Sequence, residues 1–300
     1  MPAPSLRTQR GRRCQAEGGG AVTRSDGCED APILTHKHHD APSVFTPQNL
    51  LREASRQKGL AQGSVPAVCV LDPDGDLLDY LHASGAAHRH LTWACYHTSL
   101  ATFSHDGIEC GILGRVVGAP FAVLVAEELF ASGCQFLISI TSAGQIVPLG
   151  RPPYVVLIDR ALRDEGTSYH YLPPSPFCDL PPRLREAIST HWDHTRLPLS
   201  VGASWTTDAP FRETAAMIEL CRQSGMLAVE MEAAALYALA TTKRYDIVCF
   251  ALVTNQMGQS GGDFEKGDVS GSQTLLHIID QTVRIWEHMH QPGERPDPIP

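Results

Sequence analysis

The stretch CGILGRVVGAPFAVLVAEELFASGCQFLISI, residues 110–140, decides the fold class. It begins with an apolar run over residues 110–117, continues with helical spacing over 120–132, and ends with a second apolar run over 136–140. Short runs that are rich in Val, Ile and Leu are typical of buried strands, whereas the middle segment has the period of a helix. The stretch therefore predicts a strand, a helix and a second strand in that order.

The same alternation continues on both sides of this stretch. Further strands are predicted by apolar runs at residues 65–71, 154–158, 199–203 and 247–253. Further helices are predicted by helical spacing at residues 47–58, 183–190, 211–224, 229–242 and 272–289. Helices that lie between strands predict an α/β fold with a mainly parallel or mixed sheet and helices on both faces. Ligands of such sheets bind beyond the carboxyl ends of the strands, so the residues that follow each apolar run are the first candidates for a site.

The composition indicates a folded protein that acts on a small molecule. Apolar residues make up 43% of the 300 residues and charged residues 19%, which excludes a chain disordered throughout. The formal net charge is −9 and no Lys or Arg cluster follows the first two dozen residues, which argues against a nucleic-acid partner. No apolar run approaches the roughly 18 residues of a spanning helix, and the amino terminus lacks a secretory signal. We therefore expect a cytoplasmic protein with no membrane partner.

One α/β domain over residues 44–290 accounts for the pattern. Residues 1–43 are rich in Arg, Gly, Ser and Pro, so burial cannot offset their ordering entropy and we predict a disordered tail. Residues 291–300 carry four prolines and are predicted to form a frayed end. Nine Cys without a Cys-x-x-Cys pair indicate reduced, buried thiols, and the string from His36 to Asp40 is interpreted as solvated tail. We predict neither a metal site nor an organic cofactor.

Two carboxylates open an otherwise apolar helix in the string VEMEAAALY, residues 229–237. The helix dipole favours an acidic residue at a helix start, and for Glu230 this structural explanation and a role in binding are both open. Glu232 is followed by an uncharged run as far as Thr242, and a carboxylate at the mouth of a buried helix is costly unless it accepts hydrogen bonds. A diol ligand would supply those bonds.

This string resembles the purine nucleoside and uridine phosphorylase family. The resemblance also rests on TTD at residues 206–208, on TSAG at residues 141–144 and on the glycine-rich turn GRVVGAP at residues 114–120, and it extends over residues 65–281. It implies a three-layer α/β fold with a twisted, mixed and mostly parallel central sheet, distorted toward a barrel and flanked by helices. It also implies homodimers or hexamers, and cleavage of the N-glycosidic bond of a nucleoside.

The resemblance assigns roles to residues at two predicted element ends. The second Glu of the family's string binds the ribose hydroxyls and its Met packs on the sugar, which transfers to Glu232 and Met231. The chemistry agrees, because a carboxylate bound to the sugar hydroxyls stabilises the positive charge of an oxocarbenium-like sugar. The other substrate-binding candidates at these ends are Glu230, Thr141, Ser142 and Gly144.

The phosphate site departs from the family pattern. The family's first phosphate loop reads Gly-Asp-Pro-x-Arg, and the matching segment LDPDG, residues 71–75, lacks both the glycine and the arginine. Two further phosphate arginines of the family fall at Ser139 and near Tyr96 and His97. Only Ser142 keeps a family phosphate ligand.

Arg115 is the candidate for a compensating cation, because it follows a predicted strand and faces the same cleft. An ordinary ion pair with a nearby carboxylate is the alternative. His97 and His170 are candidates for contact with the sugar or the nucleophile, although a lone His is more often a satisfied polar residue.

Base recognition is predicted after the last long strand. Purine-specific family members usually carry an Asp at the position of Asn255, where it protonates the leaving base. Asn255 cannot act as an acid, but it can donate to a carbonyl oxygen and accept from a ring N–H, which suits an oxopurine or a pyrimidine better than adenine. Phe211 is predicted to form a wall of the base pocket, with a place in the core as the alternative.

Three functions are compatible with these observations. The first is phosphorolysis of a nucleoside to free base and sugar 1-phosphate, with phosphate as co-substrate and with Glu232, Asn255 and Arg115 as catalytic candidates. The second is hydrolysis, because charge-assisted bonds to Arg are the strongest available to phosphate, whereas water needs no such cradle. The third is a non-catalytic nucleoside sensor that keeps the sugar site.

Overall fold

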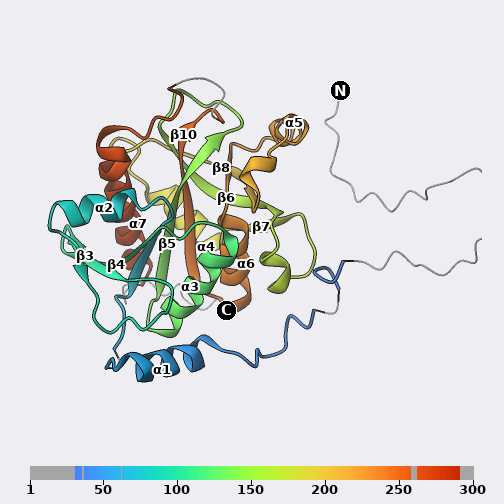
Figure 1. The fold of residues 1–300 in the computed structure, drawn as a ribbon. Helices are drawn as coiled ribbons and strands as arrows, with labels where there is room; N and C mark the ends of the chain where they lie inside the picture. Colours follow the sequence, from blue (N-terminus) through green and yellow to red (C-terminus); the bar gives the residue numbers. More distant parts are fainter. Residues whose placement is uncertain (1–30, 36, 62, 258–261, 291–300) are drawn as a thin grey trace, which may run out of the picture.

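The computed structural model describes residues 31–35, 37–61, 63–257 and 262–290. In this part of the chain, strands and helices alternate as the apolar runs predict (Figure 1). Its strands are β1 (Val68–Asp72), β2 (His88–Arg89), β3 (Ala101–His105), β4 (Ile108–Gly114), β5 (Phe136–Gln145), β6 (Tyr154–Asp164), β7 (Phe177–Asp179), β8 (Leu199–Thr207), β9 (Ala228–Glu230) and β10 (Asp246–Asn255).

Seven α-helices and three short 3₁₀ helices are found in the described residues. The α-helices are α1 (Pro47–Lys58), α2 (Asp76–Ala83), α3 (Ala119–Ala131), α4 (Pro182–His191), α5 (Ala215–Gln223), α6 (Ala233–Lys243) and α7 (Ser272–His290). The 3₁₀ helices are η1 (Ser168–His170), η2 (Pro210–Arg212) and η3 (Asp268–Gly271).

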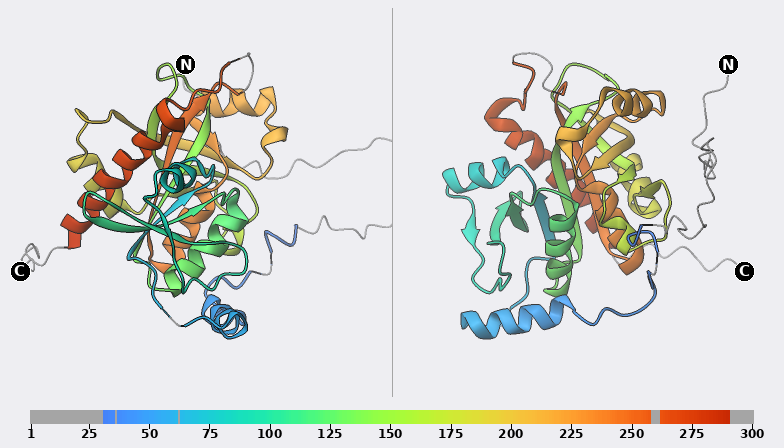
Figure 2. Two further views of the ribbon diagram at one scale, coloured as in Figure 1. Left: turned by 60° about the vertical axis from the view of Figure 1, so that its left-hand side comes forward. Right: turned by 45° about the vertical axis from the view of Figure 1, so that its right-hand side comes forward.

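The strands form one mixed sheet that partly closes on itself. They pair in the order β10, β6, β8, β9, β5, β1, β4, β3, β2, with β7 beside β6. Because β10 also pairs with β5, the strands β5, β10, β6, β8 and β9 form a closed ring. The long pairings β5 with β10 and β6 with β8 are parallel, whereas β10 with β6 and β5 with β9 are antiparallel. The predicted α/β fold with a mixed, barrel-like sheet is confirmed, and Figure 2 shows its helices outside the sheet.

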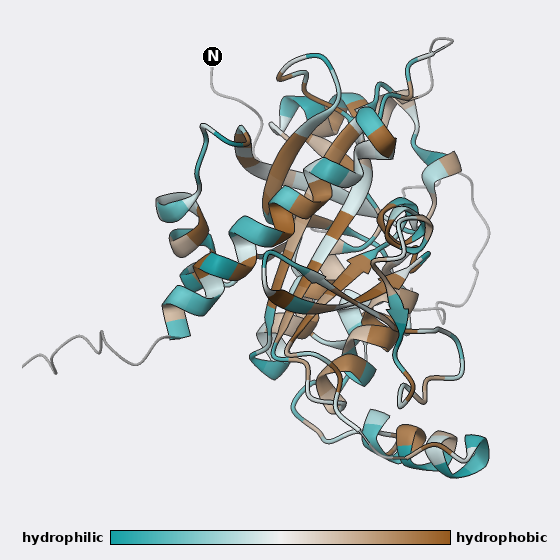
Figure 3. Cartoon of the chain, turned by 90° about the vertical axis from the view of Figure 1, so that its left-hand side faces the viewer, coloured by the Kyte–Doolittle hydropathy of each residue, from teal (hydrophilic) through white to brown (hydrophobic). Residues whose placement is uncertain are grey.

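The core lies between the sheet and the helices that cover it. Nine of the ten residues of β10 are buried, which is why its sequence is a continuous apolar run. Trp286 of α7 stacks on Phe136 of β5 with ring centroids 5.2 Å apart. α6 is buried from Ala233 to Ala240, because a helix that is apolar on every side has no face for water. Apolar residues accordingly concentrate on the strands and inner helices in Figure 3.

Some short elements differ from the sequence predictions. The helix predicted over residues 229–242 begins at Ala233, because Ala228–Glu230 pairs with β5 and β8 as the strand β9. The eight-residue helix α2 and the two-residue strand β2 were not predicted. Such elements contain too few periodic positions to show a pattern.

The segment before α1 contacts the loop around η1. Lys37 Nζ lies 3.0 Å from His170 Nδ1, and His39 Nε2 lies 3.2 Å from the carbonyl oxygen of Tyr169. The last residues of the predicted tail, 37–43, are therefore part of the described chain. Their contacts with the folded domain are polar, and for this reason the segment shows no apolar periodicity.

The remaining predictions for the chain ends fall outside the described residues. These are residues 1–30, His36 and residues 291–300. No helix of the described chain has the length and the apolar character that a membrane crossing requires.

Candidate active site

Several strands end at one edge of the sheet. β4 is parallel to β1, β1 to β5, and β5 to β10, so their carboxyl ends point the same way. The amino end of α6 lies at this edge, because Glu232 accepts a hydrogen bond from the N–H of Gly118 at 2.7 Å, in the turn after β4. The fold thus brings together the string around Glu232, the end of β5 and the end of β10.

Glu230 closes the amino end of α6. Its Oε2 accepts hydrogen bonds from the backbone N–H groups of Glu232 and Ala233, at 2.7 Å each. Its Oε1 accepts from the hydroxyl groups of Ser204 at 2.9 Å and Thr206 at 2.5 Å. Both oxygens are occupied by the protein, so the structure favours the helix-capping interpretation and does not support the predicted contact with substrate.

Glu232 differs from Glu230, because one of its carboxylate oxygens has no hydrogen-bond partner among the described residues. The residue is 1% exposed, and its Oε2 is buried with no hydrogen-bond partner in the described chain. Burial and the charge of Glu230 raise the pKa of Glu232 to about 8, and the hydrogen bond from the Gly118 N–H offsets only part of this effect. An unsatisfied buried polar atom costs about 1–3 kcal/mol, so a ligand hydroxyl would be stabilised at this position.

The raised pKa of Glu232 predicts a pH dependence of stability. Between its ordinary value of 4.5 and its folded value of about 8, the folded protein holds a proton that the unfolded chain has released. The free energy of unfolding is therefore expected to fall as pH rises through this interval, by about 5 kcal/mol. Urea denaturation at a series of pH values measures the slope.

The variant Glu232→Gln cannot ionise and provides the control. Because His residues also titrate in this interval, the difference between wild type and variant is the informative quantity. Parallel curves for the two proteins would contradict the raised pKa.

Thr141 and Ser142 belong to the final part of β5, where consecutive side chains point to opposite sides of the strand. Thr141 is buried and its hydroxyl donates to the carbonyl oxygen of Ser142 at 3.2 Å, whereas the Ser142 hydroxyl donates to Asp74 Oδ2 in the loop after β1. The two predicted residues therefore face different surroundings.

Gly144 and Asn255 are paired at the end of β5 and β10. Asn255 Oδ1 accepts from the N–H of Met257 at 2.9 Å, and its Nδ2 donates to Thr254 Oγ1 at 3.2 Å. A Cβ at Gly144 would lie 2.4 Å from the Met257 sulfur, so a larger residue here would require the Met257 side chain to shift. Met231, the predicted sugar contact, is half-buried next to Glu232.

Arg115 lies over the loop after β1, where a Cβ at Gly75 would lie 2.9 Å from the Arg115 Cγ. Its guanidinium donates to Asp79 Oδ2 at 2.6 Å, and its side chain is 61% exposed. Its backbone has a φ of 62° and its N–H donates to the carbonyl oxygen of Asp72 at 2.9 Å, at the end of β1. The structure shows the alternative ion pair with Asp79, and the predicted replacement of the phosphate arginines stays a prediction.

The variant Arg115→Ala is therefore expected to have small effects. An exposed ion pair contributes about 1 kcal/mol or less, so the free energy of unfolding should change by no more than that amount. The KM for phosphate, if phosphate is used, should stay within about twofold of the wild-type value. Steady-state kinetics and urea denaturation measure both quantities, and a tenfold rise in that KM would return Arg115 to the site.

Three other predicted residues lie apart from Glu232. The side chain of Phe211 in η2 is 98% exposed, so it forms no wall of a base pocket in the described chain. His97 is exposed beside Tyr96, with ring centroids 6.5 Å apart, and His170 in η1 contacts Lys37. Short loops set the direction of all three side chains, and loops have no periodicity from which a direction could be predicted.

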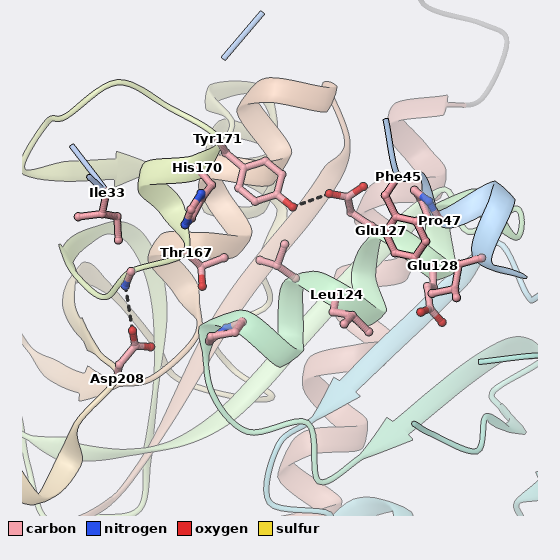
Figure 4. A pocket seen from close by; sticks show the side chains of 14 residues that line it. Ile33, Phe45, Pro47, Leu124, Glu127, Glu128, Thr167, His170, Tyr171 and Asp208 are labelled. Carbon is pink, nitrogen blue, oxygen red and sulfur yellow. Dashed lines mark hydrogen bonds between the residues drawn. The ribbon is translucent and has the colours of Figure 1, made fainter. Parts of the chain in front are cut away.

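A cavity of about 570 Å³ lies beside the turn that binds Glu232. Figure 4 shows its lining, which includes Thr167 and Asp208 as well as His170. The N–H of Gly166 donates to Asp208 Oδ2 at 2.8 Å. Pro120, two residues after the N–H that binds Glu232, also lines the cavity, whereas Glu232 and Ser142 do not.

The sequence reasoning missed Asp74 and Lys266. Lys266 Nζ lies 2.8 Å from Asp74 Oδ2 and also binds Asp76. Lys266 and Asp74 are 192 residues apart, so no local pattern joins them. The available signal was the segment LDPDG, which has an acidic residue before the position of the family arginine.

Several proteins of known name are similar to this chain in sequence. Guanosine phosphorylase of Halorubrum lacusprofundi is 28% identical over 170 residues, which cover 53% of this chain and 69% of the relative. Uridine phosphorylase of Thermococcus kodakarensis is 26% identical over 220 residues, which cover 65% of this chain and 77% of the relative.

The solved structures show the same fold. Purine nucleoside phosphorylase of Toxoplasma gondii in complex with immucillin-H has a TM-score of 0.63 at 14% identity, covering 76% of this chain and 93% of that chain. The sequence profile of the Phosphorylase superfamily matches residues 68–284, from β1 into α7. With most of its length matched, the chain belongs to the Phosphorylase superfamily.

Proposed function

We propose that this protein cleaves the N-glycosidic bond of a nucleoside. The observation that carries the proposal is the buried, unpartnered Oε2 of Glu232 at the head of α6 in the described chain. Adjacent hydroxyl groups of a ribose can each donate a hydrogen bond to a carboxylate and leave its charge in place. Relatives named guanosine, purine nucleoside and uridine phosphorylase support a nucleoside as the class of substrate.

Glu232 would act by stabilising charge on the sugar. As the bond to the base breaks, the sugar becomes cationic, and a carboxylate held in a water-poor site interacts with it strongly. Sugar hydroxyls and positive charge both favour the ionised carboxylate, so they oppose the burial that raises the pKa of Glu232 to about 8. Because this interaction is stronger in the transition state than with the neutral substrate, it lowers the barrier.

Asn255 is our candidate for recognition of the base. Its oxygen is held by the N–H of Met257 and its amide donates to Thr254, so the side chain is fixed at the end of β10. A fixed amide beside the sugar site can donate to one base atom and accept from another without acting as an acid. We propose that the reaction needs neither a metal ion nor an organic cofactor.

Phosphate is the acceptor that the names of the relatives support. Ser142 and the backbone at the end of β5 are the groups that would contact it, giving a sugar 1-phosphate and free base. A second acceptor, water, is favoured by one observation. The carboxylate of Asp74 already binds the Ser142 hydroxyl, where an anion would have to enter.

Incubation with a panel of purine and pyrimidine nucleosides tests the proposal. Chromatography of the released base, with and without phosphate, measures cleavage whichever acceptor is used. We expect at least one nucleoside to be cleaved by the wild type and the rate to fall sharply in Glu232→Gln. Saturable binding of a nucleoside without any release of base would instead indicate a sensor.

We also propose that the chain assembles as a homodimer or a hexamer, as the family resemblance implies. Large apolar side chains are exposed near the cavity and its turn, with Phe45 at 71%, Val117 at 51% and Leu124 at 38%. Exposed apolar groups of this kind are typical of contact surfaces. Light scattering measures the molar mass, and a monomer at every concentration would contradict this assembly.

A further inference from the structure

The cavity beside α3 is lined by a different set of residues from the edge that holds Glu232. Its volume is about 570 Å³, and neither Glu232 nor Ser142 belongs to its lining. The walls come from the segment before α1, from α1 and α3, from the loop around η1 and from the residue that follows β8. A cavity of this size accommodates a small organic molecule.

Apolar side chains form much of the wall. Val123 and Leu124 line the cavity from α3, and Leu50 lines it from α1, with Phe45 from the segment that leads into α1. Phe45 is 71% exposed and Leu124 is 38% exposed, so water covers apolar surface that a ligand would bury. The body of a ligand in this cavity is therefore expected to be apolar.

The polar part of the wall is acidic. Its three carboxyl groups belong to Glu127 and Glu128 on α3 and to Asp208 after β8, and the described lining contains no Lys or Arg. Figure 4 shows Glu127 and Glu128 at one end of the lining and Asp208 at the other. The Tyr171 hydroxyl donates to Glu127 Oε1 at 2.5 Å, and the Gly166 N–H donates to Asp208 Oδ2 at 2.8 Å. Each of these two carboxylates thus keeps a second oxygen for a ligand.

Glu128 has the greatest need of a partner. It is 1% exposed, and neither of its oxygens has a hydrogen-bond partner among the described residues. Burial raises the pKa of Glu128, and the charges of His97 and Lys58 offset only part of this effect. A buried carboxyl group without partners is costly, so a positively charged donor that entered the cavity would be stabilised by Glu128.

His170 does not supply the missing positive charge. Its Nδ1 lies 3.0 Å from Lys37 Nζ, and because an ammonium group only donates, this ring nitrogen accepts and carries no proton. Burial and the charge of Lys37 lower the pKa of His170, and Lys37 itself is not part of the lining. The carboxyl groups of the cavity therefore have no cation among the residues that line it.

We propose that this cavity binds an organic cation, an aliphatic amine whose ammonium group binds Glu128 and Glu127 and whose apolar body packs on Leu124 and Phe45. An ammonium group supplies three N–H donors and the positive charge that the acidic wall lacks. The CH₂ groups of the amine cover the apolar wall, and an anionic ligand would be repelled by the same carboxyl groups. This site goes beyond the proposed nucleoside cleavage and does not depend on it.

Three probes of equal chain length and different charge test the proposal. The wild type is titrated with hexylamine, with hexan-1-ol and with hexanoate, and binding is measured by calorimetry and by the rise of the melting temperature. We expect saturable binding of hexylamine, binding of hexan-1-ol that is weaker by about tenfold or more, and no binding of hexanoate. Equal affinities for hexylamine and hexan-1-ol, or no saturable binding of hexylamine, would overturn the proposal.

Two variants separate the charge of the cavity from its space. Glu128→Gln is expected to raise the Kd of hexylamine by about tenfold or more and to leave that of hexan-1-ol within about twofold. Leu124→Trp keeps every carboxyl group but fills part of the cavity, so it should weaken the binding of both probes. Asp79→Asn is the matched control, because it removes a carboxylate that is paired with Arg115 outside the cavity, and it should keep the wild-type Kd. Wild-type affinity for hexylamine in Glu128→Gln or in Leu124→Trp would overturn the proposal.

A second copy of the chain is the competing occupant, because the assembly proposed above uses apolar side chains near the same cavity. The Kd of hexylamine is expected to be the same at low and at high protein concentration. A Kd that rises with protein concentration would show that a second copy fills the cavity, and it would overturn the amine site.

Discussion

The variant Glu232→Gln is expected to lower kcat/KM for nucleoside cleavage by about 10²-fold or more. Gln keeps the size of the side chain and the ability to bind hydroxyl groups, but it removes the negative charge that stabilises a cationic sugar in the transition state. The same variant is expected to raise the melting temperature. It replaces a buried carboxyl group that has an unpartnered oxygen in the described chain and a pKa raised to about 8.

The opposite signs of these two effects separate a functional role from a structural one. Glu128→Gln is a comparison for the stability effect alone, because Glu128 is also 1% exposed and has no hydrogen-bond partner for either oxygen in the described chain, but it lines the cavity next to Pro120. It should change the melting temperature in the same direction. A nearly unchanged rate in Glu232→Gln would remove Glu232 from the reaction.

The variant Glu230→Ala is expected to reduce the free energy of unfolding by about 3 kcal/mol or more. It deletes a fully internal carboxylate that binds two backbone N–H groups at the start of α6 and the hydroxyls of Ser204 and Thr206. Truncation leaves these buried donors without partners and removes the cap of a helix that lies in the core. Urea denaturation measures the loss.

Glu230→Gln provides the comparison for this prediction. A Gln side chain keeps one acceptor oxygen and presents an amide to the other donors, so it should lose part of the stability rather than all of it. If Glu230→Ala unfolds at the wild-type urea concentration, the capping network does not hold α6. A large loss of activity in a fully stable Glu230→Ala would instead restore a direct role in binding.

Long buried strands and helices could be predicted from the sequence because each of them carries a strong periodic signal. Phe136–Gln145 and Asp246–Asn255 are continuous apolar runs, and Ser272–His290 has regular helical spacing. β9 could not be predicted, because its three residues are recognisable only through their pairing with β5 and β8. The closed ring is likewise a property of long-range pairing, which local patterns do not contain.

The candidate site was predictable where a residue is fixed by the end of a long element. Glu232 at the head of α6, Ser142 on β5 and Asn255 on β10 meet at one edge for that reason. Phe211 was predicted to form a wall of the base pocket, but it lies in a 3₁₀ helix and is 98% exposed, and Arg115 in the turn after β4 pairs with Asp79. The direction of such side chains depends on loop geometry rather than on periodicity.

Carboxyl groups are found at Glu232 and in the loop after β1. In the proposed reaction Glu232 would stabilise a cationic sugar, whereas Asp74 and Asp76 of the loop bind Lys266, which compensates part of their charge. The segment LDPDG, residues 71–75, matches the family's phosphate loop but lacks its arginine. In this loop, Asp74 accepts a hydrogen bond from Ser142, the residue that matches the family's phosphate ligand.

The most direct test of the account is a crystal structure of Glu232→Gln with guanosine or uridine bound. This variant is expected to bind a nucleoside and to cleave it slowly enough for the intact molecule to be seen. We expect the 2′- and 3′-hydroxyl groups of the nucleoside to lie within hydrogen-bond distance of the side chain at position 232. A nucleoside that binds only elsewhere, with its hydroxyl groups away from position 232, would contradict the central claim.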